Sequence, residues 1–190
     1  MVDFVIPKDN EEEFISMAEK LGYKELVFLY EFNSYINKKC DFINKKIKIS
    51  AGIITDPKNI DKINSKFKNG ELFIAIKSSV KDREIIENQK ANLIFGFEEN
   101  SKRDFLHQRG SGLDHILCKL VHENNVIIGL SLNSILNSDN KNIIFGRMMQ
   151  NIRLCDKFKV KILIGSFSQS PYRMRSPQDL TKLLNILRIA

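Results

Sequence analysis

Short apolar runs alternate with amphipathic segments along most of this 190-residue chain. The apolar runs have the length of strands and begin near Asp3, Glu25, Lys46, Leu72, Ala91, Val126 and Val160. Most are followed by a segment in which apolar residues recur every three or four positions, as in helices that bury one face. This alternation is typical of β/α units around a parallel sheet. We therefore predict an α/β fold, a TIM-barrel-like (β/α) barrel of about seven parallel strands.

An open, doubly wound sheet is the alternative architecture for the same element order. The glycine-rich loops that bind nucleotide phosphates in such sheets, GxGxxG and GxxxxGK[ST], are absent from the sequence. With 190 residues, 43% hydrophobic and 28% charged, the chain suits one domain over residues 1–190. Residues 32–45 and 98–110 show no clear period, and the second segment is long for a loop in a compact domain.

Several helix starts carry capping signals. A polar residue followed three positions later by an acidic one satisfies the free amides at a helix start. The pairs are Asn10 with Glu13, Ser79 with Asp82, Ser111 with Asp114, and Ser176 with Asp179. Pro177 strengthens the last signal, because proline suits the first helical position. A further helix is expected to start at Asp56 and Pro57 and to end by Gly70.

Two helical segments in the second half combine a core stripe with a basic outer face. Residues 107–124 have a stripe of Leu113, Ile116, Leu117, Leu120 and Val121, and an opposite face of His115, Lys119 and His122. Residues 143–160 have a stripe of Ile144, Met148, Ile152 and Cys155, another face of Gln150, Arg153 and Lys157, and Arg147 at its margin. Each basic face can equally be a solvated helix surface.

Positive charge is concentrated in the second half. The chain has a net charge of +7, and residues 101–190 hold 14 Lys and Arg against 6 Asp and Glu. Seven of the eight arginines lie there. The planar guanidinium of arginine can make two hydrogen bonds to one phosphate group. This distribution favours a nucleic acid as the partner over a membrane, for which the sequence has no basic amphipathic anchor.

The sequence has no apolar stretch long enough to cross a bilayer and no secretory signal pattern at its N-terminus, so we expect a cytoplasmic protein. Its three cysteines, Cys40, Cys118 and Cys155, are far apart and form no CxxC pair. We expect free thiols rather than disulfides or a zinc site. Cys118 and Cys155 are expected to be at least partly buried, because each lies beside core-stripe residues.

Three basic elements are candidates for contact with phosphate. Arg109 precedes the helix start near Ser111, where free amides already favour anions. The basic face of residues 143–160 is the second element. The third is the loop from Tyr172 to Arg175, which follows the last predicted strand and opens, in a β/α barrel, on the face that carries function. Tyr172 can stack on a base or pack over its own loop.

Catalytic constellations are absent. The histidines are His107, His115 and His122, whereas a metal-dependent hydrolase on a barrel needs ligands at several strand ends. Lys119 stands where an HExxH pair starting at His115 would need its second histidine. A GxSxG nucleophile elbow is missing as well. The sequence therefore predicts no catalytic residue and no metal ligand in this chain.

Three motifs resemble the barrel-fold protein subunits of ribonuclease P, the family that includes archaeal protein component 3. They are RGSGLDHILCKL at residues 109–120, FGRMMQNIRLCDKFKV at 145–160 and SPYRMRSPQDL at 170–180. The resemblance follows the element order of the whole chain and is specific from about His107 onward. It implies a TIM-barrel-like protein, distantly similar to phosphoesterases whose metal-binding histidines are missing here.

The resemblance also implies a function. The chain would be an RNA-binding subunit of ribonuclease P, supporting the endonucleolytic removal of 5′ leaders from precursor tRNA by the catalytic RNA. The implied partners are that RNA, precursor tRNA, protein component 2 and the other protein subunits. No cofactor is expected on this chain, and Mg²⁺ is expected at the RNA. The residues implied to contact RNA are Arg109, His115, Lys119, Arg147, Arg153, Lys159, Arg173 and Arg175.

Two other functions fit parts of the sequence. A metal-dependent β/α-barrel phosphoesterase or hydrolase would retain a divalent metal on purification and would act without RNA. A protein scaffold whose basic half binds an acidic partner would carry no RNA at all.

Overall fold

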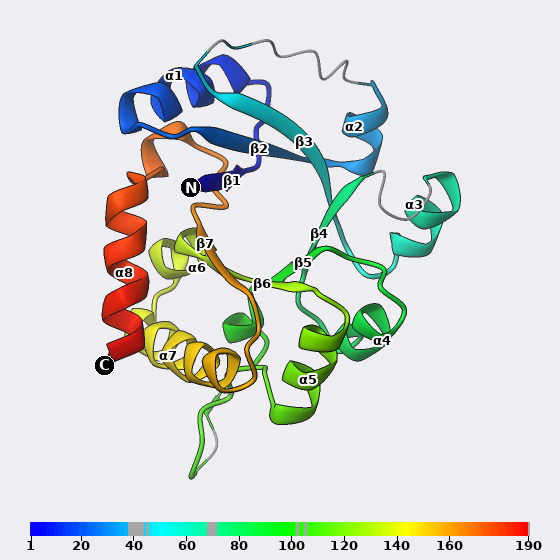
Figure 1. The fold of residues 1–190 in the computed structure, drawn as a ribbon, viewed down its shortest axis with the longest axis vertical. Coiled ribbons are helices and arrows are strands. Elements are labelled where there is room, and N and C mark those ends of the chain that lie inside the picture. Colours follow the sequence, from blue (N-terminus) through cyan, green and yellow to red (C-terminus); the bar gives the residue numbers. More distant parts are fainter. Residues whose placement is uncertain (38–43, 45, 68–71, 102, 105, 190) are drawn as a thin grey trace.

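Seven parallel strands form the centre of the computed structural model, which describes residues 1–37, 44, 46–67, 72–101, 103–104 and 106–189 (Figure 1). They are β1 Val2–Val5, β2 Glu25–Glu31, β3 Lys48–Thr55, β4 Phe73–Lys77, β5 Leu93–Phe95, β6 Ile127–Ser131 and β7 Ile162–Gly165. Each strand pairs with the next one in the chain. The strand order has no reversal, so the predicted barrel is confirmed and the doubly wound sheet is not.

Helices follow the strands and surround them (Figure 1). They are α1 Glu11–Leu21, α2 Phe32–Asn37, α3 Ile60–Lys66, α4 Asp82–Glu87, α5 His115–Glu123, α6 Leu132–Asn137, α7 Lys141–Lys157 and α8 Pro177–Ile189, with the short 3₁₀ helices η1 Phe97–Glu99 and η2 Pro171–Arg173. The stretch that follows β2 therefore begins with a helix, and the rest of the unreadable segment up to Lys45 lies largely outside the described residues.

The barrel closes between its first and last strands through a short seam. Residues that follow β7 pair with β1: Phe167 N donates to Phe4 O at 2.8 Å, and Ile6 N donates to Ser168 O at 2.8 Å. The buried carboxylate of Asp3 accepts from Ser166 N at 2.7 Å. Burial raises the pKa of Asp3 to about 6, although the hydrogen bonds from Ser166 oppose this shift. The seam replaces a continuous β7–β1 ladder, so the barrel is nearly closed.

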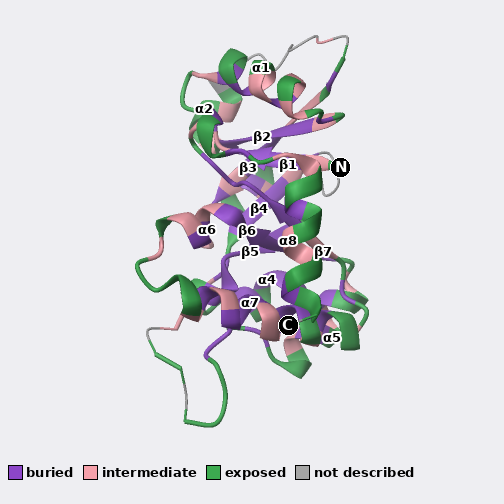
Figure 2. Ribbon diagram, turned by 90° about the vertical axis from the view of Figure 1, so that its left-hand side faces the viewer, coloured by how far each residue is buried: buried purple, intermediate pink, exposed green. Residues whose placement is uncertain are grey.

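Side chains alternate between the inside of the barrel and the layer under the helices, as period-two strands require. Three phenylalanines fill the interior: the rings of Phe95 and Phe167 stack at 4.5 Å, and Phe4 lies 5.8 Å from Phe167. The strands are buried along most of their length (Figure 2). The barrel is therefore a packed core rather than a pore.

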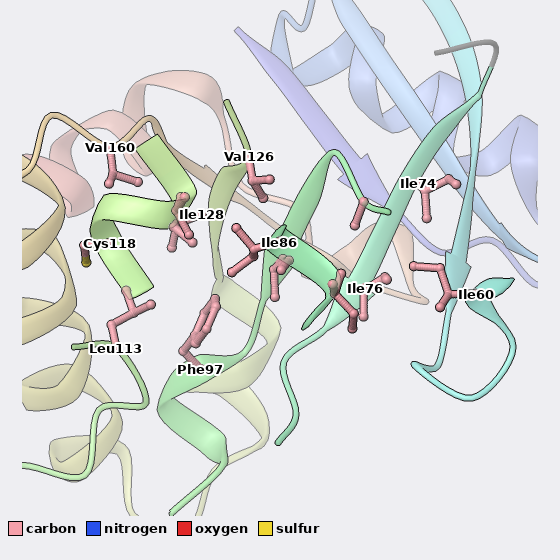
Figure 3. Close-up of a cluster of buried hydrophobic side chains, with 14 of the residues drawn as sticks. Ile60, Ile74, Ile76, Ile86, Phe97, Leu113, Cys118, Val126, Ile128 and Val160 are labelled. Atoms are coloured by element: carbon pink, nitrogen blue, oxygen red, sulfur yellow. The ribbon is translucent and has the colours of Figure 1, made fainter. Parts of the chain in front are cut away.

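The outward strand residues pack against the helices, as the close-up of one cluster shows (Figure 3). Ile76 and Ile128 meet residues of the helical layer there, including Ile86 of α4 and Cys118 of α5. Cys118 and Cys155 are free and fully buried, as predicted, whereas Cys40 lies outside the described residues. Burying the isoleucine and valine side chains of this cluster contributes roughly 1.5–3 kcal/mol each. The cluster thereby fixes the positions of α5 and α7.

Some local predictions were wrong. Asn10 precedes α1 without capping it, because its side-chain oxygen accepts from Lys8 N instead. Asp114, not Ser111, caps α5 by accepting from Leu117 N at 2.7 Å. Ile116 of the predicted core stripe is 49% exposed. The helix expected from Asp56 begins only at Ile60.

Two other capping predictions are confirmed in substance. Ser176 Oγ accepts from Asp179 N at 3.2 Å, and it donates to the carboxylate of Asp179 at 2.8 Å, so the signal before α8 is a working cap. Asp82 reaches back to Ser79 N at 2.8 Å at the start of α4. These bonds in the first turn explain why both helices start close to the predicted positions.

Candidate functional site

The loop after β5 is held by one buried arginine of α7. Arg147 is only 3% exposed, and its Nη1 donates to Glu98 O at 2.8 Å and to Ser101 O at 2.7 Å. Its Nε donates to Asp104 Oδ1 at 2.8 Å. Arg147 thus fastens the first arm of this loop to α7, and its guanidinium is turned into the protein.

Asp104 joins the first arm of this loop, which contains Ser101, to the second arm, which contains Arg109 and Gly110. Besides Arg147, it accepts from Gly110 N at 2.9 Å, and it lies 3.7 Å from the Nη1 of Arg109. Burial pushes the pKa of Asp104 upward, but the hydrogen bonds from Arg147 and Gly110 and the two guanidinium charges outweigh it, so its pKa lies below the ordinary value. A Cβ at Gly110 would lie 2.7 Å from Ser101, so glycine permits this close approach of the arms.

Arg109 lies over α7 rather than over the start of α5. Its guanidinium covers the backbone at Gly146, where any side chain would collide with it. Gln150 Nε2 donates to Arg109 O at 3.3 Å and to Ser111 Oγ at 2.9 Å. The Arg109 side chain is still half exposed. α7 therefore presents Arg109 to solvent from a fixed position.

The outer surfaces of α5 and α7 carry the next group of predicted residues. His115 and Lys119 are exposed on α5, and Arg153 is exposed on α7. Lys159 is also exposed, but it follows α7 and so lies at the opposite end of the barrel from Arg109. Its carbonyl oxygen is 3.0 Å from His122 Nδ1, which ties the ends of α5 and α7 together.

The loop between β7 and α8 presents Arg173 and Arg175. Arg173 is exposed, and its Nη1 donates to Asn133 Oδ1 at 3.2 Å and to Asn137 Oδ1, both from the α6 region. The Nη1 of Arg175 donates to Met174 O at 2.7 Å. Tyr23 holds the loop from the α1 side by donating to Arg175 O at 2.6 Å.

Tyr172 extends from the same loop and is 78% exposed. Tyr172 therefore does not pack over its own loop, and its ring is accessible to a partner. Tyr172 directly precedes Arg173 in η2. An exposed aromatic ring and guanidinium groups on one loop are a combination that binds unpaired bases together with their phosphates.

The predicted set thus separates into three groups. The loops at the carboxyl ends of β5 and β7 carry Arg109, Arg173 and Arg175; the outer helix surfaces carry His115, Lys119 and Arg153; Lys159 lies at the amino end of β7. Arg147 belongs to none of them, because it is buried. Contact of each residue with RNA stays a prediction.

Two cavities open at the carboxyl ends of the strands, and sequence reasoning missed both. One, of about 500 Å³, lies over the barrel mouth near Phe95 and Phe167. The other, of about 490 Å³, lies between Lys77 at the end of β4 and the α6 and α7 region. Lys77 and Glu99 line both and form an ion pair at 2.6 Å. The sequence signals for these cavities were weak. Lys77 is a charged residue at the end of an apolar strand, and Asn133 and Asn137 follow a different strand.

Glu98 is a second feature that the sequence did not indicate. Its carboxylate is fully buried in η1, and neither oxygen has a hydrogen-bond partner among the residues that the structure describes. Burial, followed by the charge of Glu99, raises the pKa of Glu98 to about 7. The carboxylate is closed off from solvent, and we give it no catalytic role.

Metal ligands do not converge in the described part of the chain: no three His, Cys, Asp or Glu side chains there are placed to hold an ion. No described helix is long and apolar enough to cross a membrane.

Fold and site together define a β/α-barrel protein with arginines presented on the loops around its open end. A family model described as RNase P subunit p30 matches residues 1–189. The chain belongs to this family.

Named relatives and solved structures agree with this assignment. The chain is 25% identical to Ribonuclease P protein component 3 of Methanocaldococcus jannaschii, covering 96% of this chain and 81% of that protein. It is 26% identical to the protein of the same name from Methanococcus vannielii, covering 94% and 69%. A chain in a cryo-EM structure of archaeal Ribonuclease P with mature tRNA superposes with a TM-score of 0.78 at 23% identity, covering 99% and 83%.

A histidinol phosphate phosphatase from Lactococcus lactis superposes with a TM-score of 0.67 at 11% identity, covering 98% of this chain and 93% of that one. Both structural likenesses concern the fold alone.

Proposed function

We propose that this chain is an RNA-binding protein subunit of ribonuclease P, which supports the endonucleolytic removal of 5′ leaders from precursor tRNA. Family membership supports the proposal, as do relatives named Ribonuclease P protein component 3 and the similar chain in archaeal Ribonuclease P with mature tRNA. The partners are the catalytic RNA, precursor tRNA, component 2 and the other protein subunits. The isolated chain is not catalytic, and the Mg²⁺ of the reaction binds the RNA.

One structural observation carries the proposal: the protein itself holds its exposed arginines in place. Arg109 lies against Gly146, and Arg173 is tied to Asn133 and Asn137. Holding a side chain before it binds reduces the entropy lost on binding. Guanidinium groups fixed in this way are suited to the regularly spaced phosphates of RNA.

The predicted residues then divide into two roles. Arg109, His115, Lys119, Arg153, Lys159, Arg173 and Arg175 contact RNA, whereas Arg147 acts from inside the protein by holding the loop that presents Arg109. Removing a contact residue weakens RNA binding without unfolding the protein. Removing Arg147 chiefly lowers the stability of the protein and affects RNA binding only through the loop that presents Arg109.

The salt dependence of RNA binding tests the contact role. Each phosphate contact adds roughly 0.7 to 0.9 to the slope of log affinity against log salt. Arg109→Ala, Arg173→Ala and Arg175→Ala are each expected to flatten the slope by about one contact. Arg83→Ala is the control, because Arg83 is exposed on α4 and is not one of the predicted contacts. Slopes unchanged in all three arginine variants would contradict the proposed contacts.

The catalytic role of the RNA is tested by reconstitution. Precursor tRNA cleavage is expected from the assembled subunits with RNA and Mg²⁺, and not from this chain alone. Cleavage by the isolated chain that a chelator abolishes would favour the metal-dependent hydrolase instead.

A further inference from the structure

The cavity between β4 and α7 has the size of a ligand site. Its volume is about 490 Å³, within the range of pockets that hold a molecule as large as a nucleotide. It lies at the carboxyl ends of the parallel strands, where β/α barrels bind their ligands. Arg173 borders it on one side through its bonds to α6, and Arg147 lines it on the other.

The asparagines of the α6 wall are oriented by Arg173. A guanidinium has only donors, so the oxygens of Asn133 and Asn137 must face it. The Nδ2 groups of both side chains therefore remain as donors, and neither has an acceptor within the described residues. Both residues line the cavity.

The α7 wall adds a buried donor without a partner. Arg147 is 3% exposed, and its Nη2 is enclosed and has no acceptor among the residues described. A buried polar group left in this state costs about 1–3 kcal/mol, so such groups usually have a partner. The Nη1 and Nε of the same guanidinium are engaged by the loop, which fixes its direction.

Lys77 completes the set, and Glu99 opposes it. The ammonium of Lys77 pairs with the carboxylate of Glu99 at 2.6 Å, and both line the cavity. The lining thus offers the amide groups of Asn133, Asn137 and Asn140 and an ammonium as donors against one carboxylate, with the positive charge of Arg147 enclosed behind the wall. This composition suits a ligand rich in acceptors that can replace Glu99 on Lys77.

We propose that this cavity binds a phosphate group carried by a nucleotide. The phosphate takes hydrogen bonds from Asn133, Asn137 and Lys77, and the remaining volume accommodates the nucleoside. The nucleotide is either free or one unit of an RNA strand, and the phosphate chemistry is the same for both. The site stands on its own geometry, so binding of a free nucleotide does not depend on the proposed ribonuclease P function.

Two substitutions distinguish this ligand from other polar ligands. Asn137→Asp keeps an oxygen for Arg173 but places a negative charge in the wall, so it is expected to weaken binding about tenfold or more. Glu99→Gln removes the only carboxylate among the described residues of the lining and frees Lys77, so it is expected to tighten binding about threefold. A cationic ligand would respond in the opposite direction to both.

The experiment is a calorimetric titration of the full chain with uridine 5′-monophosphate, uridine and a short single-stranded oligouridylate. Uridine 5′-monophosphate, or the oligonucleotide, is expected to bind with the variant pattern above, and uridine is expected not to bind. Asn185→Asp is the matched control, because Asn185 is exposed on α8 and does not line the cavity. Circular dichroism checks that each variant is folded.

The outcomes separate the two sources of the phosphate. The variant pattern with the mononucleotide alone assigns the site to free nucleotides, and the pattern with the oligonucleotide alone assigns it to RNA. Equal effects of Asn137→Asp and Asn185→Asp, weaker binding by Glu99→Gln, binding of uridine with the affinity of its monophosphate, or binding of none of the three ligands would each overturn the proposal. The salt slope of Arg109→Ala, which does not line the cavity, reports on the proposed RNA function separately.

Discussion

Arg147 Nε donates to Asp104 Oδ1 at 2.8 Å, although 43 residues separate the two in the chain. The contact joins α7 to the loop after β5. Through Asp104 it also fixes Gly110 and therefore the position of Arg109. The sequence made Arg147 a candidate for RNA contact. In the structure, Arg147 holds the loop that determines the position of Arg109.

Replacing Arg147 with lysine tests this role. A single ammonium group cannot reproduce the three hydrogen bonds to Glu98, Ser101 and Asp104, so Arg147→Lys is expected to lower the free energy of unfolding by about 2–3 kcal/mol. Urea denaturation measures the change. Arg153→Lys on the exposed side of α7 is the control, with an expected change below about 0.5 kcal/mol. Equal midpoints for the two variants would refute the anchoring role.

The buried carboxyl of Glu98 makes stability depend on pH. Its pKa in the folded protein is about 7, above the ordinary 4.5, so between these values the folded protein retains a proton that the unfolded chain releases. The free energy of unfolding therefore falls as the pH rises through this window. Glu98→Gln removes the effect and is expected to stabilise the protein by about 2–3 kcal/mol at pH 8, with little change at pH 4.5.

Urea midpoints of the wild type and Glu98→Gln between pH 4.5 and 8.5 provide the measurement. Asp3, with a pKa of about 6, adds a similar dependence below pH 6 that both proteins share. A difference between the two proteins that does not grow with pH would argue against a buried, protonated Glu98.

Two glycines are expected to respond differently to alanine. Gly146→Ala favours the helix, but its Cβ collides with the guanidinium of Arg109, a flexible end that can move. Stability should be unchanged or higher, and RNA binding should weaken as in Arg109→Ala. Gly112 has a φ of +85°, and its Cβ would lie 2.5 Å from Phe97 O, so Gly112→Ala is expected to cost about 1–3 kcal/mol.

RNA affinity and thermal unfolding of both glycine variants provide the comparison. Unaltered RNA binding by Gly146→Ala would show that the position of Arg109 on α7 has no part in recognition.

The seam of the barrel can be tested at Asp3. Asp3→Asn keeps an oxygen that accepts from Ser166 N, whereas Asp3→Ala leaves the amides of Ser166 and Phe4 without that acceptor. Asp3→Ala is expected to lose about 2–4 kcal/mol of stability, and Asp3→Asn considerably less. Hydrogen exchange at Ser166 should accelerate in Asp3→Ala first, and identical exchange in both variants would mean that the carboxylate does not hold the seam.

The strands could be predicted because each is an apolar run that the barrel buries on both sides. β4 and β6, for example, are buried by the interior on one face and by the helices on the other. The helix caps were less predictable, because a side chain such as Asn10 or Ser111 has several amides or donors within reach, and local sequence does not decide among them. Asp114 took the capping role that Ser111 was expected to have.

The site could be predicted only in part. The arginines of the β7–α8 loop follow a strand that is evident from the sequence. Their position at the carboxyl end of that strand could therefore be predicted. The burial of Arg147 could not be predicted, because residues 98–110, which include its partners Glu98, Ser101 and Asp104, have no period from which a path can be inferred. The cavity lining joins Lys77, Asn133 and Arg147 from three separate units, a coincidence that only the closed barrel creates.

The seam between β1 and the residues after β7 also sets an order on synthesis. Asp3 and Ser166 are 163 residues apart, so the first strand leaves the ribosome long before its last partner is made. Until Ser166 has left the ribosome the edge of β1 has no neighbour on that side, so closure of the barrel is a late event. A nascent chain that stops before Ile162 carries six strands and an open edge, a state exposed to misassociation in the cell.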